Sequence, residues 1–360
     1  MTAARSRHDH FPREDSARCR RIREAVAAAG AAWRAADSAP GGLLAAIDAA
    51  QGTAPDVAVS RLLPWLDDTS WLQARLDAAL ALLAADPFAR PPLRLVGGGD
   101  SGAGGGPGGL VLADRGIVRL TLLVRPAGSC IAPPATAVFV PGRAAIRVLA
   151  GGGGSLVAHE VAVGAAEEAG GFTASAASPC RSQPPRALRA GELLRLDTAR
   201  QSWSLADARR DVLLLELAVQ PPSPLPIRAY DVASGRLIHV SASRRDSSFR
   251  AMALTLLRHL GRTDAAPLFA AEAKVADFAA RWHAMRELVA LDPAAAHPHL
   301  AAMAVTDPHP EVRCAAAATS ALIFPPSGET GREGGGGTGP CTCPAPSTPY
   351  RGTDARRCPA

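Results

Sequence analysis

The sequence predicts an α+β protein in which helices come first, antiparallel strands form the middle and helices follow again. The hydrophobic pattern has a helical period in residues 16–95, changes to short strand-like runs in 109–240 and becomes helical again in 246–323. The chain has 360 residues, of which 48% are hydrophobic, which is enough for two or three domains with real cores.

The first region is helical after a polar start. Residues 1–15 are expected to be disordered, and 16–95 to form several helices. The clearest of these is DDTSWLQARLDAALALLAADP, in which apolar residues recur at helical spacing from Trp71 to Leu83. Polar N-cap candidates precede this helix, and an Asp-Pro pair ends it.

A glycine-rich segment at 96–108 follows the helices. A phosphate-binding loop needs Gly-Lys-Ser/Thr after its glycines and a helix behind them. Neither is present, and a strand pattern follows instead. We therefore expect a flexible loop here.

The net charge of +6 lies mainly at the ends of the chain. Residues 1–24 hold seven arginines and four acids, and residues 329–360 hold four arginines and three acids. The body of the protein therefore lacks the strong positive field of a nucleic-acid-binding protein, and no nucleic-acid partner is expected.

The cysteines and the hydrophobic runs indicate the cellular compartment of the protein. The seven cysteines are scattered and odd in number, and no secretory signal precedes them. A disulfide framework is therefore not expected, and the cytoplasm is the predicted compartment. No apolar run approaches the ~20 residues that span a bilayer, so no membrane partner is expected. Only one of the 39 basic residues is a lysine, Lys274, which is typical of a GC-rich bacterial genome.

The strand-like runs between 109 and 240 include IVRLTLLVRP, AAIRVLAG, LVAHEVAV and DVLLLELAV, separated by Gly and Pro punctuation. The segment that starts at Gly191, GELLRLDTARQSWSLADARRDVLLLELAV, has the order of a glycine, a strand, a turn and another strand. It resembles the second motif of the cupin family. The resemblance implies an antiparallel β-barrel, which in the family often holds a metal ion.

The metal ligands of that family are missing from the corresponding positions. The motif's histidine falls on Ser202, and no histidine follows Gly128, where the first motif is expected. The only histidine between residues 11 and 238 is His159, for which we expect a solvent-facing position on a strand. We therefore predict no metal, no cofactor and no catalytic residues. A metal-dependent enzyme stays open as an alternative if three of five residues converge, namely His159, His239, Glu160, Glu192 and Glu216.

The C-terminal region, 246–323, reads as helical hairpins. SSFRAMALTLLRHLG has a capping serine, Ser247 or Ser248, at its start and Gly261 at its end. Its apolar residues fall on one helical face: Phe249, Met252, Ala253, Leu256, Leu257 and Leu260.

The stretch TDPHPEVRCAAAA predicts a turn between two helices. Asp307 and Pro308 end one helix, and Pro310 begins the next, because its missing N–H is not needed in a first turn. The stretch resembles a HEAT-type repeat, whose signature spacing is held here by Asp307, Val312 and Arg313. The resemblance implies HEAT-like helical hairpins in which Asp307 and Arg313 are structural residues that bridge successive repeats. A repeat array usually needs about three repeats, so this region must pack on something else.

Three further residues are candidate contacts. Arg244 and Arg245 stand just before a helix and could bind an anion or a partner. Trp282 is either a core residue or an interface residue. Other clusters lack the spacing of a metal site, namely His297, His299 and His309 on predicted loops beside Pro298 and Pro308, and Cys341, Cys343 and Cys358 in the tail.

These observations favour a non-catalytic interaction or scaffold protein that uses HEAT-like helices and a metal-free, cupin-like barrel. One alternative is a sensor that binds a small molecule in the barrel, and another is the metal-dependent enzyme. The partner cannot be named. Residues 324–360 lack a hydrophobic period and are predicted to be a disordered tail, with a frameshifted gene end as the alternative.

Overall fold

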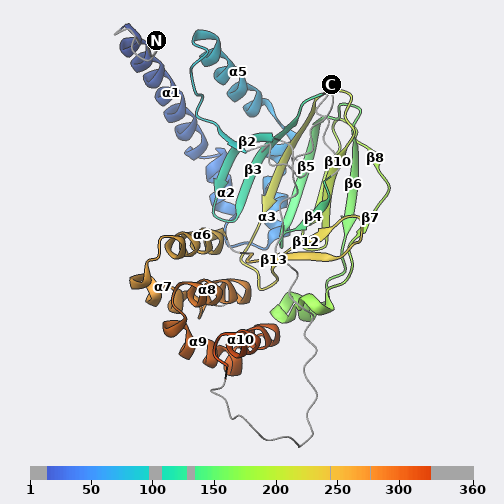
Figure 1. Ribbon diagram of the computed structural model, residues 1–360. Helices are drawn as coiled ribbons and strands as arrows, with labels where there is room; N and C mark the ends of the chain where they lie inside the picture. Colours follow the sequence, from blue (N-terminus) through green and yellow to red (C-terminus); the bar gives the residue numbers. More distant parts are fainter. Residues whose placement is uncertain (1–13, 97–107, 128–133, 244, 276, 326–360) are drawn as a thin grey trace, which may run out of the picture. The chain divides into compact units, whose positions relative to one another are not determined.

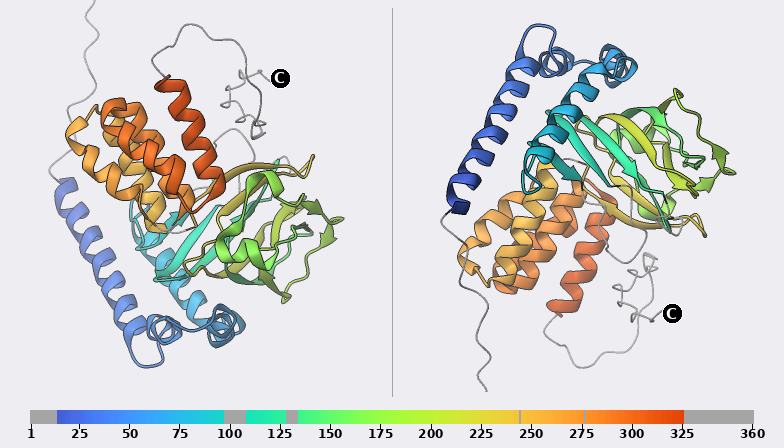
Figure 2. Two further views of the ribbon diagram at one scale, coloured as in Figure 1. Left: turned by 90° about the horizontal axis from the view of Figure 1, so that it is seen from below. Right: turned by 90° about the horizontal axis from the view of Figure 1, so that it is seen from above.

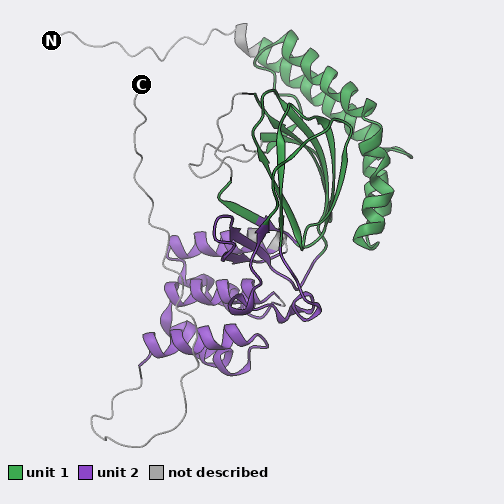
Figure 3. Cartoon of the chain, turned by 90° about the vertical axis from the view of Figure 1, so that its right-hand side faces the viewer, with its two compact units in different colours: residues 1–137, 141–160, 182–221 green, residues 138–140, 161–181, 222–360 purple. Residues whose placement is uncertain are grey.

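The computed structural model describes residues 14–96, 108–127, 134–243, 245–275 and 277–325. The chain forms two compact units, which Figure 3 shows in green and purple. Unit 1 consists of residues 1–137, 141–160 and 182–221, and unit 2 of residues 138–140, 161–181 and 222–360.

Unit 1 begins with five helices, two of which start at a proline: α1 (Glu14–Ser38), α2 (Leu43–Ala50), α3 (Pro55–Leu62), α4 (Pro64–Asp67) and α5 (Ser70–Ala85). Helix α1 packs on α5. A buried arginine of α5, Arg75, binds Asp37 at 2.6 Å and lies over the rings of Trp33 and Trp71. This charged residue is therefore balanced by a carboxylate and two aromatic faces.

A six-stranded sheet follows, in the order β1-β2-β3-β11-β5-β9, and its neighbouring strands all pair antiparallel. Its strands are β1 (Arg94–Val96), β2 (Gly108–Arg115), β3 (Val118–Arg125), β5 (Arg143–Ala150), β9 (Leu193–Asp197) and β11 (Val212–Val219). Strand β11 lies at the centre, between β3 and β5, which explains the continuous apolar run of its sequence.

A four-stranded sheet contains β10 (Gln201–Ala206), β6 (Ser155–Glu160), β7 (Arg181–Ser182) and β8 (Arg186–Ala187). The chain passes into it through the glycine turn 151–154, in which Gly152 and Gly153 have φ values of +58° and +67° that favour glycine. The predicted closed barrel is therefore wrong. Within the described residues the two sheets remain separate, and β7 and β8 have only two residues each.

Alternating side chains of β11 separate two cores of unit 1. Leu215 and Leu217 face the helices α2 to α5, while Val212 and Leu214 face the interior between the two sheets. Helices therefore cover one face of the six-stranded sheet, and the four-stranded sheet covers the other (Figure 1).

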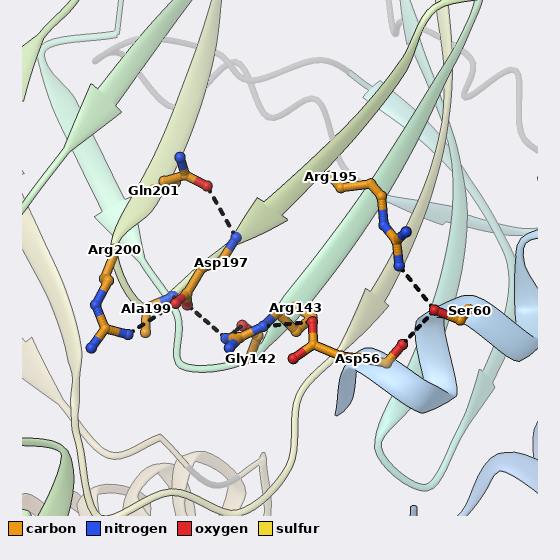
Figure 4. A network of polar contacts seen from close by, with 9 residues as sticks. All are labelled: Asp56, Ser60, Gly142, Arg143, Arg195, Asp197, Ala199, Arg200 and Gln201. Carbon is orange, nitrogen blue, oxygen red and sulfur yellow. Dashed lines mark hydrogen bonds and ion pairs between the residues drawn. The ribbon is translucent and has the colours of Figure 1, made fainter. Parts of the chain in front are cut away.

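A polar network fixes helix α3 to the edge of the six-stranded sheet (Figure 4). Arg143 binds Asp56 of α3 at 3.0 Å and Asp197 of β9 at 2.7 Å. Asp197 also accepts hydrogen bonds from Arg200 and from the backbone N–H of Ala199, which shapes the turn between β9 and β10. Asp197 thus has a structural role.

Unit 2 contains a three-stranded sheet in the order β13-β12-β4, made of β13 (Leu237–Ser241), β12 (Ile227–Asp231) and β4 (Thr136–Phe139). The runs IRAYDV and RLIHVSAS, which a Ser-Gly turn separates, predict a β-hairpin. This prediction is confirmed, because β12 and β13 pair antiparallel around a turn in which Gly235 has a φ of +68°. Arg228 of β12 is fully buried, with its guanidinium over the rings of Phe139 and Phe172.

The helices of unit 2 lie side by side in Figures 1 and 2. They are α6 (Arg245–His259), α7 (Ala266–Glu272), α8 (Phe278–Leu291), α9 (Pro293–Thr306) and α10 (Pro310–Ile323). The predicted start of a helix at Pro310 is confirmed. The predicted loop around Pro298 is wrong, because Pro298 lies inside α9, where its missing N–H removes one backbone hydrogen bond of the helix.

Helix α6 differs from its prediction in two ways. It begins at Arg245, so Ser247 lies inside the helix and is buried, and it does not cap the helix. The predicted apolar face is largely exposed: Phe249, Met252, Leu256 and Leu260 are 58–68% exposed. Gly261 does end the helix, with a φ of +64°.

The predictions for residues 1–13, most of the glycine-rich loop, Cys341, Cys343, Cys358 and the tail beyond Pro325 fall outside the described residues. Cys314 takes part in a disulfide bond, while Cys19 and Cys180 are thiols, so one bond is present where no disulfide framework was expected. Across the described part of the chain, no helix combines the length and apolarity that a membrane span requires.

The network around Arg143 gives a first prediction. Replacing Arg143 with Met removes both ion pairs, and because these groups are partly exposed, the free energy of unfolding should fall by about 1 kcal/mol. Urea unfolding at low and high salt measures this, and the loss should shrink at high salt. The exposed Arg90, changed to Met, is the control, and an equal loss in both variants would contradict the role of the network.

Candidate functional site

A buried ion pair organises the helices of unit 2. The guanidinium of Arg281, in α8, donates to both carboxylate oxygens of Asp307, at 2.9 Å from Nε and 2.8 Å from Nη2. The two side chains are 8% and 3% exposed. This bidentate geometry joins the start of α8 to the turn between α9 and α10.

Asp307 satisfies several neighbours at once. Burial raises the pKa of its carboxyl, but the hydrogen bonds from Arg281 and from the backbone N–H of His309 outweigh this effect, so its pKa is lowered overall. Its backbone carbonyl accepts a hydrogen bond from Arg313 at 2.6 Å. Asp307 is therefore an ionised residue in the folded protein.

Arg281 and Arg313 make the same local contact. Each donates from Nη1 to the backbone carbonyl six residues earlier, Arg281 to Val275 at 3.0 Å and Arg313 to Asp307 at 2.6 Å. The two arginines are 32 residues apart and lie in α8 and α10. The hairpins α7–α8 and α9–α10 thus repeat one local arrangement.

A groove runs along α7, α8 and α9 beside this ion pair. It consists of two cavities of about 400 and 410 Å³ that share Ala270, Lys274 and His299. Most other lining residues are small or apolar, and Arg281 and Asp307 line one end. We call this surface the helical groove.

Lys274 supplies the uncompensated charge of the helical groove. It is exposed, and no ion pair or hydrogen bond joins its ammonium to another described residue. Arg281 and Asp307 neutralise each other, so the groove combines one positive charge with a floor of small side chains. Such a surface can accept a carboxylate together with apolar side chains.

The other predicted site residues have different positions. Val312 is buried in the core of unit 2, and Trp282 is partly buried and packs against the same core. Arg244 lies outside the described residues, and the side chain of Arg245 is not described, so the predicted contact at this pair stays a prediction. Arg281 was not identified from the sequence as a partner of Asp307. Its position 32 residues before Arg313, at the corresponding place of the preceding hairpin, was a signal that could have identified it.

The histidines of unit 2 do not converge. His309 is buried, stacks on Phe278 and contacts the carbonyl of Phe172 at 2.7 Å, while its Nδ1 has no hydrogen-bond partner. His297 lies against the ring of Phe324. Among the described residues, no group of three or more His, Cys, Asp or Glu side chains has the geometry of a metal site.

Glu216 places a carboxyl group in the interior between the two sheets of unit 1. Glu216 pairs along the strands with Thr121 and Ile146. Desolvation raises the pKa of its carboxyl, against the opposing effects of a hydrogen bond from Trp203 and the charge of Arg119. A carboxyl in this position can keep its proton and donate a hydrogen bond.

Ser202 and His159 lie on the opposite face of the four-stranded sheet. Their neighbours Trp203 and Ala158 pack into the interior, so Ser202 and His159, which pair across β10 and β6, point away from it. Ser202 therefore does not occupy a position from which it could bind a metal between the sheets.

The expectation that His159 faces solvent is wrong. His159 is 1% exposed, and its two ring nitrogens contact the hydroxyls of Ser182 at 2.8 Å and Ser204 at 3.0 Å. Burial lowers the pKa of the imidazole. His159 is thus a neutral, fully satisfied core residue, because two serines pair with it.

Comparisons with known proteins identify no family. No family model matches the sequence, and no curated protein matches it. Solved structures that resemble the chain include a cupin domain from Bordetella pertussis Tohama I, with 13% identity over 32% of this chain and 95% of that chain and a TM-score of 0.22.

Two further structures are similar to parts of the chain. An uncharacterized conserved protein with a double-stranded β-helix domain from Klebsiella pneumoniae has 11% identity over 34% of this chain and 83% of that chain, with a TM-score of 0.22. A sugar phosphate isomerase from a cupin superfamily from Silicibacter pomeroyi has 10% identity over 39% and 77%, with a TM-score of 0.25. Values this low support no statement about activity or ligands.

The buried ion pair gives a second prediction. Replacing Asp307 with Ala leaves the charge of Arg281 buried without its carboxylate, so the free energy of unfolding of unit 2 should fall by about 3 kcal/mol. Because the pKa of Asp307 is lowered, its contribution is complete above the ordinary value of 3.8 and disappears as the pH falls below it.

Urea unfolding of the full chain between acid and neutral pH measures this effect. The double variant Arg281→Met, Asp307→Leu should recover most of the stability, because no unpaired charge remains. A single variant as stable as the wild type at neutral pH would contradict the assignment.

The carboxyl between the sheets gives a third prediction. In Glu216→Gln the amide keeps an acceptor for Trp203 but cannot ionise. Because the pKa of Glu216 is raised, the wild-type protein should lose stability as the pH rises above 4.5, the ordinary value, and the variant should not. Unfolding followed by tryptophan fluorescence at acid and mildly alkaline pH compares them, and a variant that is less stable only at alkaline pH would contradict the prediction.

Proposed function

We propose that this chain is a non-catalytic interaction protein whose helical groove binds an acidic segment of a partner protein. The observation that carries the proposal is the position of Lys274, an exposed cation in the groove with no carboxylate of the described residues bound to it. An acidic side chain of a partner would supply the missing negative charge.

The lining of the helical groove supports a peptide as the ligand. Ala270, Ala273 and Ala302 leave room for side chains of a partner, and Met285 and Met303 can adapt to apolar groups. Volumes of about 400 Å³ are also at the lower end of the range for small-molecule pockets. The combination of shallow apolar surface and one charge favours a short segment that adds further contacts outside the groove.

We infer that the helices of unit 2 are HEAT-like, as the sequence resemblance suggested. The repeated contacts of Arg281 and Arg313 and the ion pair between α8 and the α9–α10 turn support this inference. The boundaries predicted for the regions of the chain, the cytoplasmic location and the bacterial origin stay predictions.

A sensor function remains the second candidate, because Glu216 places a protonatable carboxyl between the sheets. A small ligand there would have to offer a hydrogen-bond acceptor to the protonated acid or a cation to its ionised form. The metal-dependent enzyme has less support, because two of its candidate ligands do not converge. Glu216 faces the interior between the two sheets, and His159 faces away from that interior.

Binding of labelled peptides tests the proposal. A fluorescent peptide of alternating Glu and Leu should bind the full chain, a matched peptide of Lys and Leu should not, and high salt should weaken binding. Lys274→Glu should weaken the affinity about tenfold, or about 1.4 kcal/mol, while Lys274→Arg keeps it.

The exposed Arg90 of unit 1, changed to Glu, controls for the same change in net charge. Equal weakening by Lys274→Glu and Arg90→Glu, or equal binding of the acidic and basic peptides, would contradict a site at the groove. Elemental analysis of the purified chain tests the enzyme alternative, because a stoichiometric transition metal would contradict a metal-free protein.

A further inference from the structure

Helix α6 packs on the rest of unit 2 through both polar and apolar side chains. The hydroxyl of Thr255 contacts Nε2 of His283 at 3.3 Å, and Arg258 binds Glu287 at 2.5 Å, both across the contact with α8. Leu254 is buried in the core of unit 2, and Leu257 is partly buried and packs against the same core. The internal contacts of α6 therefore combine two leucines with polar groups.

The apolar side of α6 faces outward. Phe249, Met252, Leu256 and Leu260 are 68%, 64%, 58% and 63% exposed, and we call these four residues the α6 stripe. They recur at intervals of three and four residues, so they form one continuous row along the helix. Four large apolar side chains in one row are unusual for a surface that stays in water.

Segments outside the described residues lack the side chains to cover the α6 stripe. Residues 326–360 contain no Leu, Ile, Val, Met, Phe or Trp, and residues 97–107 contain none either. Residues 1–13 contain only Met1 and Phe11 of these types, and residues 128–133 only Ile131. These segments therefore offer few apolar side chains that could cover the stripe.

We propose that the α6 stripe of one copy pairs with the α6 stripe of a second copy, in antiparallel orientation about a two-fold axis. The spacing of the stripe is self-complementary. With the axis between Met252 and Leu256, Phe249 of one copy meets Leu260 of the other, and Met252 meets Leu256. Each contact joins a longer side chain to a leucine.

The charges beside the stripe permit this pairing. Arg250 is bound to Glu272 and Arg258 to Glu287 of the same unit. In a symmetric contact, unpaired arginines of the two copies would repel each other. Because both arginines are neutralised within their own unit, this repulsion is small.

The size of the stripe sets the expected strength. Four side chains of this exposure present roughly 400–500 Å² of apolar surface per copy, which is near the largest patch of ordinary monomers. A standard interface buries about 800 Å² per partner, so the dimer should be weak and its population should depend on concentration. This proposal does not rest on the peptide-binding function.

Sedimentation velocity of the full chain tests the dimer, from about 1 µM to about 200 µM, the range in which a weak interface associates. The wild type should shift from monomer to dimer across this range, and Leu256→Glu should remain monomeric because two acids would lie beside the axis. Val305→Glu, at an apolar residue of α9 that is 77% exposed, is the matched control and should still dimerise.

A mixing experiment tests the antiparallel register. Met252→Arg and Leu256→Glu should each be monomeric alone, and an equimolar mixture should form a heterodimer, because Arg at 252 of one copy then meets Glu at 256 of the other. Circular dichroism verifies that each variant is folded.

Three results would overturn the proposal: a wild type that stays monomeric throughout, a dimer that Leu256→Glu does not weaken, and a mixture that stays monomeric. The first two would exclude the stripe as a self-interface. The third would exclude the antiparallel register.

Discussion

The ion pair between Arg281 and Asp307 is the constraint on which the helical part of the protein depends. A buried guanidinium needs a carboxylate, and a buried carboxylate needs donors, so neither residue is stable in this place without the other. The pair fixes the start of α8 against the turn between α9 and α10. Because both residues also line the helical groove, the same contact that holds the helices determines the shape of the candidate binding surface.

The sequence predicted those elements whose signals are local. Pro310 marks the start of α10 because its ring suits a first helical turn, and the Ser-Gly turn before Arg236 marks the β12–β13 hairpin because glycine adopts a positive φ there. The order of helices, strands and helices also follows from the hydrophobic period. These properties are encoded within a few residues of each element.

Features that depend on distant residues were not predictable in the same way. Arg281 finds its partner 26 residues away, and no local pattern distinguishes it from the other arginines. Barrel closure depends on the length of edge strands, and β7 and β8 are too short to carry a pattern. His159 was misjudged because alternation along β6 tells which side it occupies, but not that Ser182 would cover that side.

Helix α6 shows a related limit of pattern reading. The period of its sequence correctly identified the apolar face, but the assumption that this face points into the unit failed. Its inner contacts are made by Leu254 and Leu257 together with Thr255 and Arg258, so a helix can be held in place while a row of its large apolar side chains stays exposed. Amphipathicity therefore indicates that a face is to be covered, and not which molecule covers it.

The arginine-rich composition has a practical consequence for the helical groove. Since Lys274 is the only lysine of the chain, it carries the only side-chain amine. Among the side chains of this sequence, amine-directed cross-linkers will therefore find their amine only at the groove. A single reporter group can be placed in the candidate binding surface of the natural sequence without engineering a new attachment point.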